Sequence, residues 1–71
     1  MKPIAIKVQE TDNVAVAVEL IPKGTQVFPG VTAGADIPQA HKIALEDIPS
    51  GGEIRRYGVP IGYALNDIPR G

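Results

Sequence analysis

One short phrase occurs three times between residues 35 and 71: Asp36-Ile37-Pro38, Asp47-Ile48-Pro49-Ser50-Gly51 and Asp67-Ile68-Pro69-Arg70-Gly71. The last two copies share a longer frame, because residues 44–51 align with residues 64–71. A looser copy, Leu20-Ile21-Pro22-Lys23-Gly24, lies upstream. Repetition within a chain indicates that one local structure is used several times.

The phrase has a direct conformational meaning. Proline fixes its own φ and pushes the preceding residue towards an extended conformation, which β-branched isoleucine also favours. A following Pro-x-Gly supplies a tight turn, since glycine adopts positive φ freely. Each copy therefore predicts an extended segment, one buried isoleucine and a sharp reversal. The aspartate before the isoleucine is expected to bind backbone N–H groups and hold the turn, which we favour over a catalytic role.

Composition narrows the class of protein. With 71 residues the chain predicts one small domain, residues 1–71, and the absence of cysteine removes disulfides and thiolate ligands. A net charge of −1 and only three aromatic residues argue against a nucleic-acid module. No apolar run reaches membrane-spanning length and no signal-peptide pattern is present, so we expect a soluble cytoplasmic protein with no membrane partner.

Period-two alternation predicts the first two strands. Apolar residues alternate over residues 4–8 and again over 14–18, and the polar pair Asp12-Asn13 between them is typical of a turn. The two runs predict an antiparallel hairpin. Ala15 and Ala17 on the second face of the second run indicate that this face is also covered.

The rest of the chain predicts further short strands: residues 25–28 closed by Pro29-Gly30, then 41–45, 53–56 and 59–65, with 31–35 either strand or loop. Pro60 and Gly62 favour an edge strand or a bulge. No segment shows uninterrupted helical spacing, so at most one helical turn is expected, around residues 38–40. The predicted fold is mainly β, a twisted clip or small incomplete barrel of short strands and tight Pro-Gly turns.

His41 is the single histidine and a candidate general base. It has no second histidine or cysteine at metal-ligand spacing, so no metal site is predicted, and a structural role is the competing interpretation. Lys42, Arg55 and Tyr57 are candidates for binding an acidic substrate beside it. The competing interpretation is a solvated charged face, and Arg55 and Arg56 should point to opposite sides of a strand.

The sequence resembles a known family, the N-terminal domain of altronate and galactarate dehydratases. The resemblance rests on the order and spacing of several pieces, namely residues 12–15 (Asp-Asn-Val-Ala), 37–48, 52–54, 56–58, 61–64 and 67–71. It covers nearly the whole chain. Ala40 stands where the family usually has glycine, directly before the His41-Lys42 pair.

The resemblance implies a SAF-type domain with a β-clip fold, at the N-terminus of a longer dehydratase or as its small subunit. Such enzymes remove water from a sugar acid to give a 2-keto-3-deoxy acid, with a divalent metal such as iron or manganese. It implies that a large catalytic domain or subunit carries most of the machinery, that this domain alone binds no cofactor and is inactive, and that His41 and Lys42 face the shared active site. The alternatives are a non-catalytic assembly module that dimerises through its β-edges, and an unrelated β-clip that binds sugars or protein.

Overall fold

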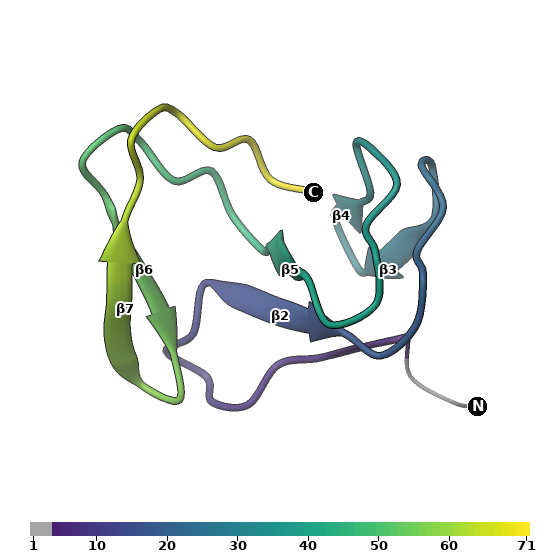
Figure 1. Ribbon diagram of the computed structural model, residues 1–71, viewed down its shortest axis with the longest axis horizontal. Coiled ribbons are helices and arrows are strands. Elements are labelled where there is room, and N and C mark those ends of the chain that lie inside the picture. Colours follow the sequence, from purple (N-terminus) through teal and green to yellow (C-terminus); the bar gives the residue numbers. More distant parts are fainter. Residues whose placement is uncertain (1–3) are drawn as a thin grey trace.

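The computed structural model describes residues 4–71, and it is an all-β structure of seven short strands with no helix in that range (Figure 1). Residues 1–3 of the predicted domain lie outside the described part. The strands are β1 (Ala5–Ile6), β2 (Val14–Ala17), β3 (Gln26–Phe28), β4 (Val31–Thr32), β5 (Lys42–Ala44), β6 (Glu53–Arg56) and β7 (Val59–Tyr63). Residues 39 and 40 form a turn rather than a helical turn. Nothing in this range is a helix that could cross a membrane.

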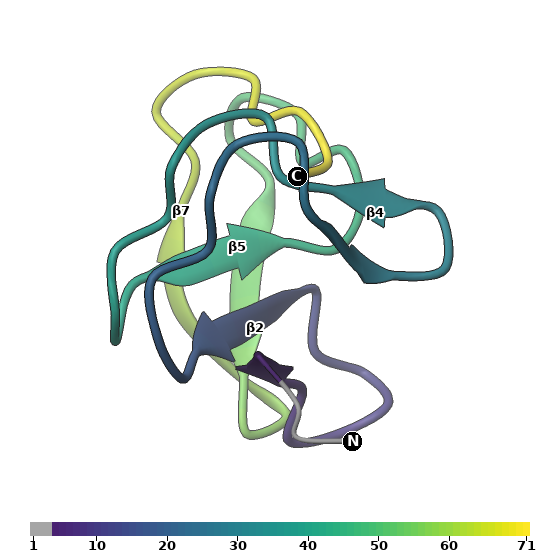
Figure 2. The same ribbon diagram turned by 90° about the vertical axis from the view of Figure 1, so that its right-hand side faces the viewer.

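Three antiparallel sheets make up the fold: β1-β2-β5, β3-β4 and β6-β7. The predicted hairpin of the first two runs is confirmed, with Ala5 opposite Ala17 and Ile6 opposite Val16. β5 pairs with the other edge of β2, so β2 is central, and β2 and β5 run side by side in Figure 2. Ala15 and Ala17 are only 1% and 2% exposed, which confirms that the second face of β2 is covered.

Four eight-residue segments, which we call corner segments, carry the repeated phrase: residues 17–24, 33–40, 44–51 and 64–71. Each begins with a buried alanine and has isoleucine and proline at its fifth and sixth positions, and the first three end in a turn. The first segment pairs with the second and the third with the fourth. Ile21 and Ile37 form an isolated antiparallel bridge, and Ile48 and Ile68 form another.

The same hydrogen bonds recur in both pairs of corner segments. The N–H of the last residue donates to the carbonyl of the first alanine of the partner segment, at 2.7–2.9 Å in all four cases. The bonds run from Gly24 to Ala33, from Ala40 to Ala17, from Gly51 to Ala64 and from Gly71 to Ala44. Each pair therefore has approximate twofold symmetry, which follows from two copies of one sequence pairing antiparallel.

The domain consequently contains two similar units, residues 17–40 and 44–71. Each unit is a hairpin between two corner segments, β3–β4 in the first and β6–β7 in the second. The hairpins begin alike, since Ala33 N–H donates to Thr25 O in the first unit and Ala64 N–H to Gly52 O in the second. Figure 1 shows the two hairpins at opposite ends of the molecule. Gly34 N–H donates to Gly71 O at 2.8 Å and joins the units.

Two apolar clusters support these units. The larger one combines the sheet β1-β2-β5 with the first unit and is built from Ala5, Ala15, Ala17, Ile21, Val31, Ala33 and Ile43. The smaller one lies under the second unit and is built from Val14, Ala44, Ile48 and Ala64. Alanine dominates both because the corner segments and strands approach closely, which leaves little space for larger side chains.

Positive φ angles occur at the last position of every corner segment. Gly24, Gly51 and Gly71 have φ of 88°, 82° and 89°, and Ala40 has φ of 70°. Ala40 therefore adopts the same left-handed corner geometry, directly before His41, as the glycines at the ends of the other three segments. An alanine in the left-handed region is strained by roughly 1–2 kcal/mol relative to the right-handed one.

Candidate functional site

The β6–β7 hairpin is held by the buried carboxylate of Asp12, a residue for which the sequence pattern predicts only a turn. Asp12 is 4% exposed, and its Oδ1 accepts from Gly58 N–H at 2.8 Å. Its Oδ2 accepts from Tyr57 N–H at 3.0 Å and from Gln9 N–H at 3.1 Å. Asp12 thus binds the tip of a hairpin more than forty residues away in sequence.

These contacts also shift the acidity of Asp12. Burial alone would raise the pKa of its carboxyl, but the hydrogen bonds from Gly58, Gln9 and Tyr57 and the positive charge of Lys7 outweigh burial and lower that pKa below its ordinary value of 3.8. The carboxylate is therefore ionised at neutral pH, in the form that accepts all three hydrogen bonds.

Asn13 completes the attachment of the hairpin. Its side chain donates from Nδ2 to Glu53 O at 2.7 Å and accepts from Arg55 N–H at Oδ1 at 2.8 Å. Its backbone carbonyl accepts from Leu45 N–H at 2.9 Å. The buried amide therefore takes the place of a strand residue opposite β6 and positions the hairpin beside β2.

Arg55, a predicted substrate ligand, is engaged with the protein itself. Its Nε donates to Thr11 O at 2.7 Å, and its Nη2 lies 3.7 Å from Glu46 Oε1. The guanidinium therefore links β6 to the segment before β2 and to the third corner segment. Its acceptor Thr11 directly precedes Asp12 and Asn13, and Asn13 Oδ1 accepts from the Arg55 N–H.

Tyr57, the second predicted ligand on the hairpin, occupies the turn. It has φ of 57° and is followed by Gly58 with φ of 73°, the pair of left-handed residues typical of a type I′ turn. Its ring is half exposed, with the Arg56 guanidinium carbon 4.6 Å from the ring centroid and Arg56 Nη2 donating to its hydroxyl at 3.1 Å.

His41 and Lys42 lie at the start of β5, away from that hairpin. The His41 backbone is fixed at both ends, since its N–H donates to Pro38 O at 3.0 Å and its carbonyl accepts from Ala17 N–H at 2.8 Å. Lys42 lies opposite Val16 in β2. Both residues are exposed. The turn that the strained Ala40 closes thus presents the two side chains on a rigid backbone.

The four predicted site residues, namely the candidate base His41 and the candidate ligands Lys42, Arg55 and Tyr57, therefore fall into two pairs. Asn13 binds the backbone of both Leu45 and Arg55, so the hairpin joins the sheet at the far end of β5 from His41. Four residues of extended strand span roughly 13 Å. Within residues 4–71 no hydrogen bond or ion pair connects His41 or Lys42 with Arg55 or Tyr57. Their roles towards a substrate stay predictions.

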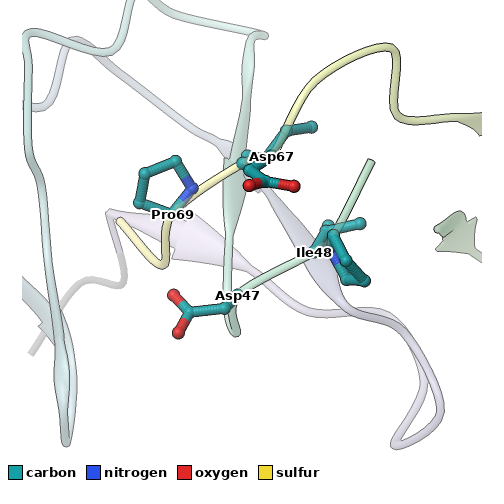
Figure 3. A pocket seen from close by; sticks show the side chains of 6 residues that line it. Asp47, Ile48, Asp67 and Pro69 are labelled. Atoms are coloured by element: carbon teal, nitrogen blue, oxygen red, sulfur yellow. The ribbon is translucent and has the colours of Figure 1, made fainter. Parts of the chain in front are cut away.

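The third and fourth corner segments enclose an open depression of about 420 Å³, lined by Asp47, Ile48, Pro49, Asp67, Ile68 and Pro69. Figure 3 shows Asp47 and Ile48 from one segment facing Asp67 and Pro69 from the other. Both carboxylates are used as caps: Asp47 accepts from Arg70 N–H and Asp67 from Ser50 N–H, each at 2.8 Å. Asp36 caps Lys23 N–H at the same distance.

The predicted capping role of the three aspartates is therefore present, but each caps the turn of the partner segment rather than its own. In the part of the chain that the structure describes, no group of three or more His, Cys, Asp or Glu side chains is placed to hold a metal ion. The residues that the structure describes therefore do not fit a divalent metal, and we derive no chemical step through a metal bound to them.

The family model of the altronate/galactarate dehydratase SAF domain matches residues 3–71. The chain belongs to this SAF domain family. The SAF domain is 53% identical over 68 residues to galactarate dehydratase (L-threo-forming) of Escherichia coli K12, and 46% identical over 69 residues to altronate dehydratase of the same strain. It is 39% identical over 69 residues to altronate dehydratase of Bacillus subtilis 168.

Each of these matches covers 93% of the SAF domain but only 13–14% of the relative's length. The chain therefore corresponds to a domain of larger proteins. The resemblance that the sequence pieces indicated is confirmed, and so is the all-β fold of short strands and tight turns.

Proposed function

We propose that this chain is the N-terminal accessory domain of a dehydratase that removes water from altronate, galactarate or a similar sugar acid to give a 2-keto-3-deoxy acid. The observation that carries the proposal is the identity of 53% and 46% over nearly the whole chain to domains of galactarate and altronate dehydratases. The partner of the domain is the large catalytic domain or subunit, and the setting is the cytoplasm.

The chemistry defines what the domain can contribute. A base must remove the proton α to the carboxylate, and a cation must stabilise the negative charge that develops on the carboxylate oxygens. His41 is the candidate base, and Lys42 is the cation beside it, both exposed at the start of β5. This exposed pair suits contact with a substrate held mainly by another domain.

Arg55 and Tyr57, on the β6–β7 hairpin, contribute differently in this proposal. Arg55 is already bound to Thr11 and Glu46, so its main role is to hold the hairpin, and any contact with a substrate carboxylate uses its remaining N–H groups. Tyr57 offers a half-exposed ring and hydroxyl at the hairpin tip. In this proposal the divalent metal that the family resemblance implies, iron or manganese, binds to the complete enzyme through residues outside this domain.

The test uses the complete dehydratase polypeptide that carries this domain, assayed for water elimination from altronate and galactarate. We expect turnover from the complete protein and none from residues 1–71 alone. His41→Ala should lower kcat at least tenfold, and Lys42→Ala should mainly raise KM for the dianionic substrate. Lys23→Ala is the matched control, since Lys23 is an exposed lysine in the turn of the first corner segment, the partner of the segment whose turn precedes His41. Normal kinetics in both variants would refute the assignment of His41 and Lys42, and a complete protein inactive on both sugar acids would refute the proposed function.

A further inference from the structure

The approximate twofold symmetry of the second unit relates Leu45 to Leu65, because both occupy the second position of a corner segment. The two leucines have very different surroundings. Leu45 is partly buried and packs against the larger apolar cluster beside the first unit. Leu65 is 90% exposed, the largest exposure among the exposed large apolar residues of the described chain. One side of the second unit is thus covered by the first unit, and the equivalent side is open.

Further exposed apolar residues lie close to Leu65 in the chain. Ser50 Oγ donates to Leu65 O at 3.3 Å, and Ser50 directly follows Pro49, which lines the depression between the third and fourth corner segments. Tyr63 and Ile61, on β7, are 64% and 48% exposed. We group Leu65, Tyr63 and Ile61 with the exposed Pro49 and Pro69 of the depression and call them the Leu65 surface. The charged groups of the depression, Asp47 and Asp67, already accept hydrogen bonds from backbone N–H groups.

We propose that the Leu65 surface docks the domain onto the remaining part of the dehydratase polypeptide, with Leu65 as the anchor side chain. This inference rests on the proposed function. Its starting point is that a fully exposed leucine beside an apolar depression is the kind of surface that marks a protein interface. A sugar acid does not suit the depression, because two carboxylates at an apolar opening would repel an anionic ligand.

The size of the surface favours a tethered partner over a second copy. A stable interface between free proteins buries about 800 Å² on each partner. That would be roughly a sixth of the 4655 Å² that this chain exposes. The largest exposed apolar patch on a typical monomer covers only roughly 300–600 Å². A domain linked to its partner experiences a millimolar effective concentration, so a smaller surface suffices. The relatives provide that partner, since the matched region is only 13–14% of their length.

Hydrogen–deuterium exchange on the complete dehydratase polypeptide tests this surface. In the wild-type protein the amides of residues 63–69 should be protected beyond what the domain's own hydrogen bonds provide. Leu65→Ser should speed their exchange at least tenfold and leave β1, β2 and β5 unchanged, because Leu65 contributes little to the domain core. Leu20→Ser is the matched control, since Leu20 is a leucine 57% exposed in the first unit, and it should leave exchange at 63–69 unchanged.

Three outcomes would overturn the inference. One is unchanged protection in Leu65→Ser, and another is equal loss in Leu20→Ser. The third is a sedimentation measurement in which Leu65→Ser halves the mass of the assembly, because the surface would then join two copies. Activity separates this inference from the proposed function: a complete protein that protects residues 63–69 through Leu65 yet dehydrates neither altronate nor galactarate would refute only the function.

Discussion

Asp67 accepts a hydrogen bond from the N–H of Ser50, and Asp47 accepts the reciprocal bond from Arg70, both at 2.8 Å. The two caps tie the third and fourth corner segments together across the Ile48–Ile68 bridge. In the first unit only one such cap exists, from Lys23 to Asp36, because Leu20 stands where the other segments have aspartate.

Asp67→Ala should therefore destabilise the chain by about 1 kcal/mol, the usual cost of losing a carboxylate cap of a backbone N–H. Urea unfolding followed by circular dichroism measures the change. Asp36→Ala removes the equivalent bond and should cost about the same. The neighbouring exposed Asn66 provides the control, and Asn66→Ala should change stability by less than about 0.5 kcal/mol. Equal effects of Asp67→Ala and Asn66→Ala would contradict the capping role.

Ala40→Gly should stabilise the domain. Removing a left-handed alanine relieves roughly 1–2 kcal/mol of strain, and the added freedom of glycine in the unfolded chain offsets about 0.4–1 kcal/mol. The expected net gain is about 0.5–1 kcal/mol in the free energy of unfolding. Gly51→Ala is the reverse experiment at the equivalent corner, where an added Cβ meets no atom within 4 Å, so its expected loss reports backbone conformation alone. A loss of stability in Ala40→Gly would show that φ of 70° at this corner carries no strain.

Asp12 should make the stability of the domain depend on acid pH. Its pKa in the folded chain is below the ordinary value of 3.8, so the unfolded chain binds the proton more readily. The resulting stabilisation is complete well above pH 3.8 and disappears as the pH falls from about that value towards the folded pKa. Asp12→Asn should be less stable than wild type at pH 7, with the difference shrinking below pH 4. Urea midpoints measured between pH 2 and pH 7 check this, and a difference that does not depend on pH would contradict it.

Variants of Arg55 and Lys42 should distinguish a cation that stabilises the fold from a cation that is available to bind substrate. Arg55→Ala removes the bond to Thr11 O and the contact with Glu46, so we expect a loss of about 1–2 kcal/mol. Lys42→Ala removes an exposed side chain and should change stability by less than about 0.5 kcal/mol. Chemical unfolding of the two variants in parallel gives the comparison. If Lys42→Ala cost as much as Arg55→Ala, its effect on KM would no longer report substrate binding.

Much of the fold could be predicted from local pattern. The alternation over residues 4–8 and 14–18 gave the hairpin of β1 and β2, and the Tyr57-Gly58 pair marked the turn between β6 and β7. Pro60 and Gly62 indicated an edge strand or bulge. β7 is in fact the outer strand of a two-stranded sheet, with a register shift opposite the Ile54–Arg55 step.

Less of the candidate site could be predicted from the sequence. The sequence pattern predicts a turn at Asp12-Asn13. The same pair also begins the first of the segments that resemble the dehydratase family, which was a signal of a larger role. Its function as a buried attachment for β6 and β7 depends on contacts 40 or more residues away. Whether His41 and Lys42 lie beside Arg55 and Tyr57 also depends on tertiary contacts. The structure attaches the hairpin that carries Arg55 and Tyr57 at the far end of β5 from His41.

The sequence by itself determined where the chain is extended and where it turns, because proline, glycine and β-branched residues restrict φ and ψ within a few residues. Only the tertiary structure decided which corner segment pairs with which, which turn each aspartate caps and which leucine is covered. All four corner segments have nearly the same local sequence pattern. Their pairing is set instead by the burial of alanines and isoleucines that lie 16 to 20 residues apart in sequence.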